Sequence, residues 1–346
     1  MRRREFLLGA AALALRRDRI DAAQALIEKA AAGGEVSAAV LHVKQGNFTF
    51  ARAFGSAGDV DTVFLLASIS KPITAAGVML LADRGLLSLS DPVRKFIPEF
   101  TGGDRDLVTV RHLLTHTSGL PDMLPENMEL RKRFAPLKEF VSRTVRTPLL
   151  FKPGTDLRYQ SMGILLAAEI AERITELRFR DFLRSEVFEP LRMTRSSLGL
   201  GGRSIFATAQ CQVPGEPWGW NSPYWRDLGS PWGGVHSTAP DIERLLRYFE
   251  RPDSRVLRPA TAREMVTNQT SGFKESYGLG WRLRAGGRAC SVRTFGHSGS
   301  TGTVCWLEPE STTSFVLLTT KPHAESGPTL LRPVSDLVSE AAQAKA

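Results

Sequence analysis

The chain has 346 residues, of which 42% are hydrophobic and 23% are charged, so it is long enough to bury a core in one large domain or two ordinary ones. No apolar run approaches the roughly 18 to 20 residues of a membrane-spanning helix, and no transmembrane helix is expected. The formal net charge is +9, but the basic residues are scattered among acidic ones. This pattern favours a solvated surface over a nucleic-acid-binding face.

The N-terminal segment 1–17 differs from the rest of the chain. MRRREFLLGAAALALRR places consecutive arginines before Phe6, Leu7 and a short apolar stretch, which resembles a twin-arginine export signal. The apolar stretch is short, and Arg16 and Arg17 follow it at once. The pattern favours export to the periplasm over the alternative of a basic cytoplasmic N-terminus.

The first predicted elements after this segment are a helix and a hairpin. From 18 to 32 the apolar residues recur with helical period, and Gly33 and Gly34 end the helix. The stretch SAAVLHVKQGNFTFARAFG then indicates two strands around a turn at Gln45 and Gly46. We therefore expect an antiparallel hairpin near the N-terminus.

The chain up to about residue 270 is predicted to be mainly helical, with frequent Pro and Gly. A helical run from 74 to 84 ends at Gly85, and further helices are expected at 137–146, 162–175 and 239–250. Strand patterns return near the C-terminus, and a last helix finishes the chain. The strands are expected at 277–283, about 288–296, 303–309 and 314–320, and the helix at about 328–343.

Strands at both ends of the chain predict one antiparallel sheet assembled from the two termini and flanked by the terminal helices. The fold class is α/β, in an α+β layered arrangement with an inserted, mainly helical region. One domain would cover 18–346. Its sheet subdomain would comprise about 18–66 plus 275–346, and its helical insert about 67–274. A site is expected in the cleft between them.

The four letters SISK at the start of the predicted helix place two serines close to one lysine. On a helix, residues three apart share a face, so Ser68 faces Lys71 whereas Ser70 does not. An amine whose pKa is lowered by burial can accept the proton of a serine hydroxyl and so activate it. Pro72 is tolerated only in the first helical turn, which places Ser68 at or just before the helix N-terminus.

The S-x-x-K spacing alone is a weak signal, because a chain of this length contains roughly one by chance. A second one, Ser271 to Lys274, lies in TSGFK, where Gly272 and a loop-like context argue against a helix. We interpret it as a chance match.

Several segments together resemble the serine β-lactamase and penicillin-binding-protein-like family, on its class C and esterase side. They occur in the family's order from about residue 20 to the C-terminus. They are LLASISKPITAAGVMLLADRGLLSLSDPV, TVRHLLTHTSGLPD, PGTDLRYQSMGILLAAEIAERI, GGVHSTAPDIERLL, YGLGW and FGHSGSTGT.

The resemblance implies roles for the matching residues. Ser68 corresponds to the acylated nucleophile and Lys71 to the lysine that assists it. Tyr159 corresponds to the tyrosine of a Tyr-x-Asn motif, a general base or proton relay. An oxyanion hole is implied at the backbone N–H groups of Ser68 and Ser300.

The sequence departs from the family pattern at two substrate-binding positions. Ser161 replaces the asparagine of the second motif, and a hydroxyl offers no amide donor for a lactam or peptide carbonyl. The third motif is His297-Ser298-Gly299 in place of Lys-Thr-Gly, as in relatives that hydrolyse esters or D-amino-acid peptides. His297 could bind a carboxylate when protonated, and Gly299 would let substrate approach the predicted edge-facing strand.

Metal-binding and disulfide patterns are weak. His112 and His116 have i, i+4 spacing but lack a third ligand candidate nearby, so a structural turn is expected there instead of zinc. The cysteines form no C-x-x-C pair. Cys290 and Cys305, on two expected strands, could pair in an exported protein or stay as buried thiols. Four tryptophans before Gly233 either pack in the core or line an acyl pocket; they are Trp218, Trp220, Trp225 and Trp232.

These observations predict a serine hydrolase that works through an acyl-enzyme and needs no metal or organic cofactor. The expected partner is a small-molecule substrate, with no nucleic acid. Small esters rank first, D-amino-acid or cell-wall peptides second and β-lactams third, because Ser161 and His297 both remove groups associated with lactam handling. A peptidoglycan-fragment binding or sensor protein is the alternative from another class. The intact Ser68, Lys71 and Tyr159 count against it.

Overall fold

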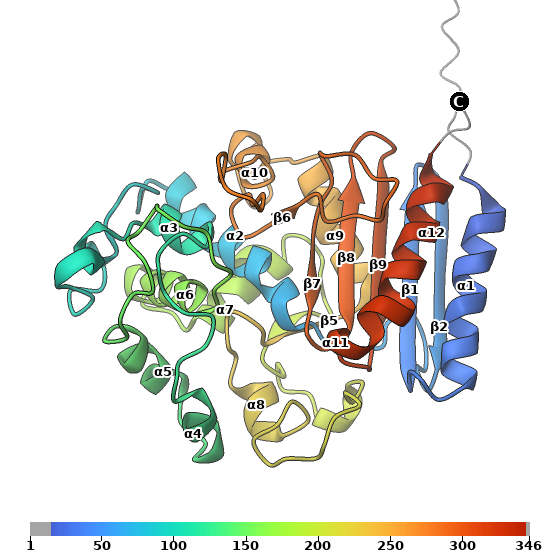
Figure 1. Ribbon diagram of the computed structural model, residues 1–346, viewed down its shortest axis with the longest axis horizontal. Coiled ribbons are helices and arrows are strands. Elements are labelled where there is room, and N and C mark those ends of the chain that lie inside the picture. The colour runs from blue at the N-terminus through green and yellow to red at the C-terminus, as the bar shows by residue number, and fades with distance from the viewer. Residues whose placement is uncertain (1–14, 344–346) are drawn as a thin grey trace, which may run out of the picture.

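The computed structural model describes residues 15–343 (Figure 1). Residues 1–14, which carry most of the predicted export signal, lie outside the described residues. Within 15–343, no helix is both long and apolar enough to cross a bilayer.

A six-stranded antiparallel sheet forms one side of the molecule, in the order β2-β1-β9-β8-β7-β6. Both ends of the chain contribute to it, so the predicted sheet built from the two termini is confirmed. The N-terminal hairpin is confirmed as well, with Gly46 in the left-handed region (φ 54°) at its turn. The strands are β1 (Ala38–Gln45), β2 (Phe48–Gly55), β6 (Arg282–Leu283), β7 (Phe295–Gly299), β8 (Thr303–Glu308) and β9 (Thr313–Thr319).

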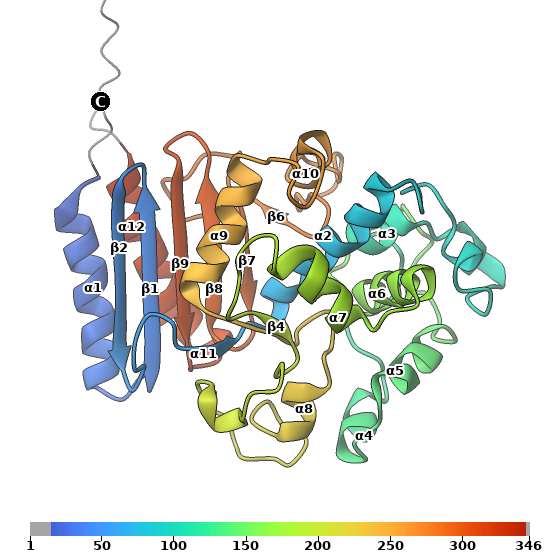
Figure 2. The ribbon, with the colours of Figure 1, turned by 180° about the vertical axis from the view of Figure 1, so that it is seen from behind.

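Helices cover both faces of this sheet (Figures 1 and 2). The terminal helices α1 (Arg17–Ala32) and α12 (Arg332–Ala342) pack on one face, and α9 (Ala239–Glu250) packs on the other. Alternating β1 side chains enter the two apolar cores, since Leu41 packs with α1 and α12 whereas Val40 packs with the helical part. The central strands of the sheet are therefore buried on both sides, whereas the edge strand β2 is largely exposed.

The helical part surrounds α2 (Ser70–Asp83), which lies between the sheet and the other helices (Figure 1). It also contains a small antiparallel sheet, in the order β3-β5-β4, that was not predicted. The remaining elements are β3 (Phe64–Leu65), α3 (Val110–Leu114), α4 (Asn127–Lys132), α5 (Leu137–Thr144), α6 (Met162–Thr175), α7 (Phe179–Leu183), β4 (Ser197–Leu198), α8 (Pro223–Asp227), β5 (Val235–Ser237), α10 (Pro259–Met265) and α11 (His323–Ser326).

The predicted strand at 277–283 is wrong over most of its length. Tyr277, Leu279 and Trp281 are buried, which produces the alternating pattern, but the chain forms a tight loop in which Gly278 N donates to Trp281 O at 2.9 Å. A Cβ on Gly280 would lie 2.6 Å from the Cβ of Ala75 in α2. The alternation therefore records loop residues packed against α2, and β6 begins only at Arg282.

The predicted strand at about 288–296 is also displaced, because β7 begins at Phe295. Cys290 lies in the preceding loop, and all three cysteines are free thiols. Of the two possibilities left open by the sequence, the structure therefore has unpaired Cys290 and Cys305.

Candidate active site

Ser68 lies in a 3₁₀ turn, Ala67–Ile69, that leads directly into α2. Pro72 occupies the first turn of the helix, as its missing N–H requires. The residue before the serine, Ala67, has φ 48°, a strained conformation for a residue with a Cβ. The sharp turn presents Ser68 as a partly exposed side chain between two buried neighbours.

Lys71 projects from the first turn of α2 onto the side of Ser68. Its Nζ lies 3.0 Å from Ser68 Oγ and donates to the carbonyl oxygen of Trp232 at 3.2 Å. The lysine is 1% exposed, and burial lowers the pKa of its ammonium from 10.5 to about 7. A substantial fraction of the amine is therefore neutral near pH 7 and able to accept a proton.

Ser70 points elsewhere, as predicted from the helix geometry. It is fully buried, and its Oγ accepts a hydrogen bond from the backbone N–H of Val235 in β5 at 2.9 Å. Its hydroxyl links α2 to the small sheet, which is a structural role.

The ring of Tyr159 packs against the side chain of Lys71. The lysine Nζ is 4.6 Å from the centroid of the phenol ring. Burial raises the pKa of Tyr159 above its usual value, and the nearby Ser68 hydroxyl partly offsets the rise. The phenol thus stays protonated at neutral pH. In this state it can pass on a proton but is not a ready-made phenolate base.

His116 holds Tyr159 in place and was not predicted as a site residue. Its ring centroid lies 4.8 Å from those of both Tyr159 and Tyr277, and its Nδ1 accepts from the backbone N–H of Gln160 at 3.3 Å. Its backbone is left-handed (φ 63°). Burial and the nearby Lys71 lower its pKa well below the usual value, so the ring is neutral. The turn-like stretch THTSG was the one feature of the sequence that indicated an unusual backbone conformation at His116.

His112 has a different role from His116, so the two do not form a pair. His112 Nδ1 accepts from the Thr109 N–H at 3.2 Å within a capping box at the start of α3. Across residues 15–343, no group of three His, Cys, Asp or Glu side chains is placed to hold a metal ion.

Ser161 is engaged by an acidic residue that the sequence did not single out. Its hydroxyl donates to Asp122 Oδ1 at 2.6 Å, and its backbone N–H donates to Asp122 O at 3.3 Å. The carboxylate also acts on Lys71, whose pKa it raises against the larger effect of burial. Asp122 is the last residue of the TVRHLLTHTSGLPD segment, but nothing in its sequence context distinguished it from other exposed acids.

The third motif lies on β7 with one edge open, because β6 pairs only with Phe295 and Gly296. This agrees with the predicted edge-facing position of His297, Ser298 and Gly299. A Cβ on Gly299 would lie 2.1 Å from Leu66 O. Glycine is therefore required here by the packing of β7 against the Ser68 turn.

His297 is buried and neutral. Its Nδ1 donates to Ser298 O at 2.8 Å, so its Nε2 is an acceptor, and that atom has no partner in the part of the chain described. Burial, with Lys71 nearby, lowers the pKa of His297 to about 3. The ring centroids of His297 and Tyr159 are 6.0 Å apart. The carboxylate-binding role expected of a protonated His297 is thus unavailable near neutral pH.

Ser300 follows β7 in an exposed turn. Two hydrogen bonds tie this turn to the residues before Ser68: Thr301 Oγ1 donates to Leu65 O at 2.6 Å, and Thr303 Oγ1 donates to Leu66 O at 2.8 Å. The backbone segments of the two predicted oxyanion donors, Ser68 and Ser300, are therefore held together. The oxyanion hole itself stays a prediction.

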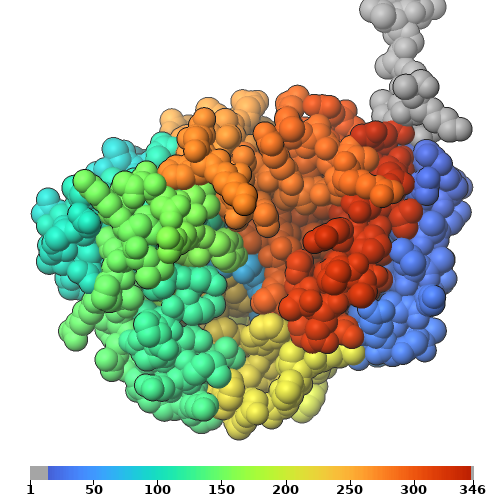
Figure 3. All heavy atoms as spheres, in the orientation of Figure 1, coloured from blue at the N-terminus to red at the C-terminus, as the bar shows by residue number. Residues whose placement is uncertain are grey.

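The site opens toward solvent. Figure 3 shows a hollow between the helical part and the sheet, with blue atoms of the α2 segment at its floor.

Of the tryptophans before Gly233, Trp225 and Trp232 are buried in the core, with ring centroids 6.4 Å apart, whereas Trp218 packs on Arg131. The second S-x-x-K, Ser271 to Lys274, lies in an exposed loop.

Comparisons with known proteins identify the family of the chain. Residues 22–338 match the protein family described as Beta-lactamase. The chain is 35% identical over 210 residues to Esterase EstB of Burkholderia gladioli, covering 54% of this chain and 52% of the esterase. It is 31% identical over 185 residues to Penicillin-binding protein 4* of Bacillus subtilis (strain 168), covering 50% of this chain and 40% of that protein. The matches thus span about half or less of these curated relatives.

Solved structures share the fold over nearly the whole chain. One is "EstCE1, a hydrolase with promiscuous acyltransferase activity", with a TM-score of 0.79 at 20% identity, covering 93% of this chain and 99% of that one. Another is the D-amino acid amidase of Ochrobactrum anthropi SV3, with a TM-score of 0.76 at 24% identity, covering 94% and 98%. The predicted fold class is confirmed.

Proposed function

The chain belongs to the β-lactamase family and is a serine hydrolase of that family, and from this premise we propose that it hydrolyses small esters through an acyl-enzyme on Ser68. The observation that carries the proposal is the 3.0 Å contact between Ser68 Oγ and the buried Nζ of Lys71. It joins a poor nucleophile to a group that can accept its proton at neutral pH.

Acylation begins with proton transfer from Ser68 to neutral Lys71. The lowered pKa of Lys71, about 7, makes this transfer feasible at the working pH. Ser68 Oγ forms a bond to the ester carbonyl carbon, and the oxyanion accepts hydrogen bonds from the N–H groups of Ser68 and Ser300. The intermediate collapses to the acyl-enzyme as the alkoxide leaves.

The leaving alkoxide needs a proton, and in this proposal Tyr159 relays it. Its phenol stays protonated because burial raises its pKa. Lys71, which gained the Ser68 proton, restores the phenol in turn. Water then attacks the acyl-enzyme carbonyl with the same groups acting in reverse, which releases the acid and regenerates Ser68.

Two features support esters over amides and lactams. The Ser161 hydroxyl already donates to Asp122, so it is not free to donate to a substrate amide carbonyl. His297 is neutral and lacks the positive charge of the lysine at that position in true β-lactamases. An ester depends less on substrate contacts at Ser161 and His297, because its alkoxide leaving group departs more readily than an amine.

The test compares substrate classes on one preparation. Wild-type protein, Ser68→Ala and Ser70→Ala are incubated with a fluorophosphonate probe, p-nitrophenyl butyrate, a D-amino-acid p-nitroanilide and a chromogenic cephalosporin. We expect labelling of wild type and Ser70→Ala only, and fastest turnover of the ester. Labelling of Ser68→Ala would refute the nucleophile. Faster turnover of the anilide or the cephalosporin would refute the ester preference.

A further inference from the structure

Asp122 presents a carboxylate at the edge of the active site. Its Oδ1 accepts from Ser161 Oγ at 2.6 Å, and its backbone carbonyl oxygen accepts from the Ser161 N–H at 3.3 Å. Ser161 is 1% exposed, whereas Asp122 is exposed. Ser161 is also the N-cap of α6, but its side chain makes no capping hydrogen bond to that helix. Asp122 is thus a carboxylate that a buried partner holds in place and that a ligand in solution can reach.

The negative charge of Asp122 acts on the groups that perform the chemistry. Burial is the main cause of the pKa shifts at Lys71 and Tyr159, but the charge of Asp122 adds to both and raises each pKa. The carboxylate therefore lies close to both side chains. When Lys71 has released its proton, it no longer offers Asp122 a positive charge.

The neighbouring arginines are engaged by other acids. Arg282, whose charge also acts on Tyr159, pairs with Glu275 at 3.3 Å, and Arg158 pairs with Asp156 at 2.9 Å. Among the described residues, the carboxylate of Asp122 has no ion pair and no hydrogen bond besides the one from Ser161. This side of the active site therefore carries an uncompensated negative charge.

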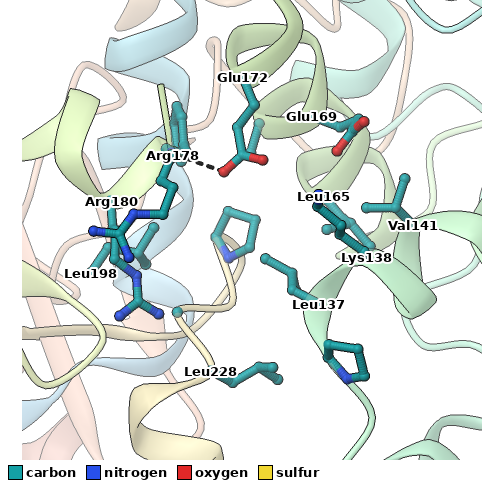
Figure 4. A pocket seen from close by; sticks show the side chains of 15 residues that line it. Leu137, Lys138, Val141, Leu165, Glu169, Glu172, Arg178, Arg180, Leu198 and Leu228 are labelled. Atoms are coloured by element: carbon teal, nitrogen blue, oxygen red, sulfur yellow. Dashed lines mark hydrogen bonds between the residues drawn. The ribbon is translucent and has the colours of Figure 1, made fainter. Parts of the chain in front are cut away.

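The acids near the other end of α6 are engaged more fully (Figure 4). Glu169 Oε1 accepts from Arg173 Nε at 2.7 Å, and Glu172 Oε1 accepts from the backbone N–H of Phe179 at 2.7 Å. Both glutamates line a cavity of about 290 Å³ that also has basic side chains in its wall, namely Lys138, Arg178 and Arg180. Positive and negative charges thus share that cavity, whereas at Asp122 the complementary charge is left to a ligand.

The chemistry at Asp122 favours a hydrogen-bond donor on the substrate. An ionised carboxylate only accepts hydrogen bonds, and the Ser161 hydroxyl has already given its proton to this one. An ammonium group supplies both donors and the opposite charge. We propose that Asp122 binds an ammonium group on the acyl part of the substrate, so that the preferred esters carry a primary amine close to the carbonyl.

This inference rests on the proposed function, because it names the acyl group that Ser68 would carry. The acyl part stays attached to Ser68 through acylation and deacylation. A contact with Asp122 would therefore orient the carbonyl in both steps, whereas a contact with the alcohol would serve only the first.

The kinetic test uses ethyl esters that share a three-carbon acyl chain. They are propionate, 2-hydroxypropionate, 3-aminopropionate and both enantiomers of 2-aminopropionate. Hydrolysis is followed by pH-stat titration at pH 7, where an amine with a pKa of about 8 is mostly charged. We expect kcat/KM for an amino ester to exceed that for propionate roughly tenfold, with the neutral hydroxy ester in between.

Asp122→Asn removes the charge and keeps an oxygen that can accept from Ser161, so the variant should fold normally, as its melting temperature will show. It also changes the pKa of Lys71. That change affects all the esters alike, so the ratio of kcat/KM between amino ester and propionate isolates the contact. The ratio should fall to near one in Asp122→Asn. The charge-matched control Glu129→Gln, at an exposed position on α4, should keep the wild-type ratio.

A binding measurement separates this inference from the ester proposal. Ser68→Ala is titrated by calorimetry with the ethyl esters of 2-aminopropionate and propionate, which needs no hydrolysis. We expect tighter binding of the amino ester, and no difference when Asp122→Asn is added.

The outcomes distinguish the two proposals. Turnover of ethyl propionate without any preference for amines that depends on Asp122 would overturn this inference and leave the ester proposal standing. Absence of turnover for every ester would refute the ester proposal, and the calorimetry would then decide the ammonium contact by itself. Faster turnover of 2-(dimethylamino)ethyl propionate than of any amino ester would overturn the placement of the ammonium group on the acyl part.

Discussion

Replacing Lys71 with methionine should stabilise the protein at neutral pH while abolishing its activity. The lysine ammonium is 1% exposed, and its pKa is lowered from 10.5 to about 7. At about 1.36 kcal/mol per pKa unit, a charged Lys71 at low pH costs the folded state about 5 kcal/mol, and the cost at pH 7 is about 4 kcal/mol. Methionine keeps the apolar length of the side chain and removes this cost.

The sign of the pH dependence follows from the same shift. Between pH 7 and 10.5 the unfolded chain holds a proton on Lys71 that the folded protein has released, so wild-type stability rises with pH across this window. Methionine cannot titrate. The advantage of Lys71→Met should therefore shrink by about 3 kcal/mol between pH 7 and 9.5. Loss of the hydrogen bonds to Ser68 and Trp232 lowers the gain by a constant amount but leaves the slope unchanged.

The assay is urea unfolding of wild type and Lys71→Met at pH 7, 8 and 9.5, followed by circular dichroism. Subtraction cancels the titration of groups common to both proteins. Lys274→Met, at the exposed second S-x-x-K, is the matched control. Its free energy of unfolding should equal that of wild type at all three pH values. A Lys71→Met advantage that is independent of pH would refute the reasoning. On the kinetic side, wild-type kcat/KM for an ester should be about tenfold lower at pH 6 than on its plateau.

Three further substitutions test individual contacts. Ser70→Ala should lower the free energy of unfolding by about 1–3 kcal/mol, because the buried N–H of Val235 loses its acceptor. Fluorophosphonate labelling should persist in this variant, and unchanged stability in urea would contradict the prediction. Asp122→Asn removes a charge that raises the pKa of Lys71, so the acidic limb of the kcat/KM profile should move to lower pH, and a shift upward would count against it. Tyr159→Phe should lower kcat roughly 10²-fold or more at unchanged melting temperature, and a loss of only a few-fold would exclude the relay.

The parts of the site that follow from local spacing were predictable. The three-residue interval between Ser68 and Lys71 sets a shared helix face, and Pro72 marks the first turn, so the pair could be placed before any tertiary contact was known. The same holds for α6 and α9, whose bounds match the expected 162–175 and 239–250 because their apolar period is uninterrupted.

The parts that depend on burial and long-range contact were not predictable. Asp122 and His116 reach the site from a loop some 40 residues before Tyr159, and neither lies on a periodic element. The neutral state of His297 results from its burial beside Lys71, which no local pattern reports. The buried loop around Trp281 was predicted as a strand, because its buried residues alternate as they do in a strand. That alternation does not specify which hydrogen bonds the backbone makes.

The two S-x-x-K occurrences in this chain separate the letters of the motif from its chemistry. Ser271 and Lys274 have the same spacing as Ser68 and Lys71, but they lie in an exposed loop where water solvates the ammonium. Lys71 differs because α2 is buried along almost its whole length, so the amine loses its hydration and releases its proton near neutral pH. The apolar run ITAAGVMLL that follows SISK is what buries the helix. That run, more than the serine and lysine themselves, is the part of the sequence that makes the motif reactive.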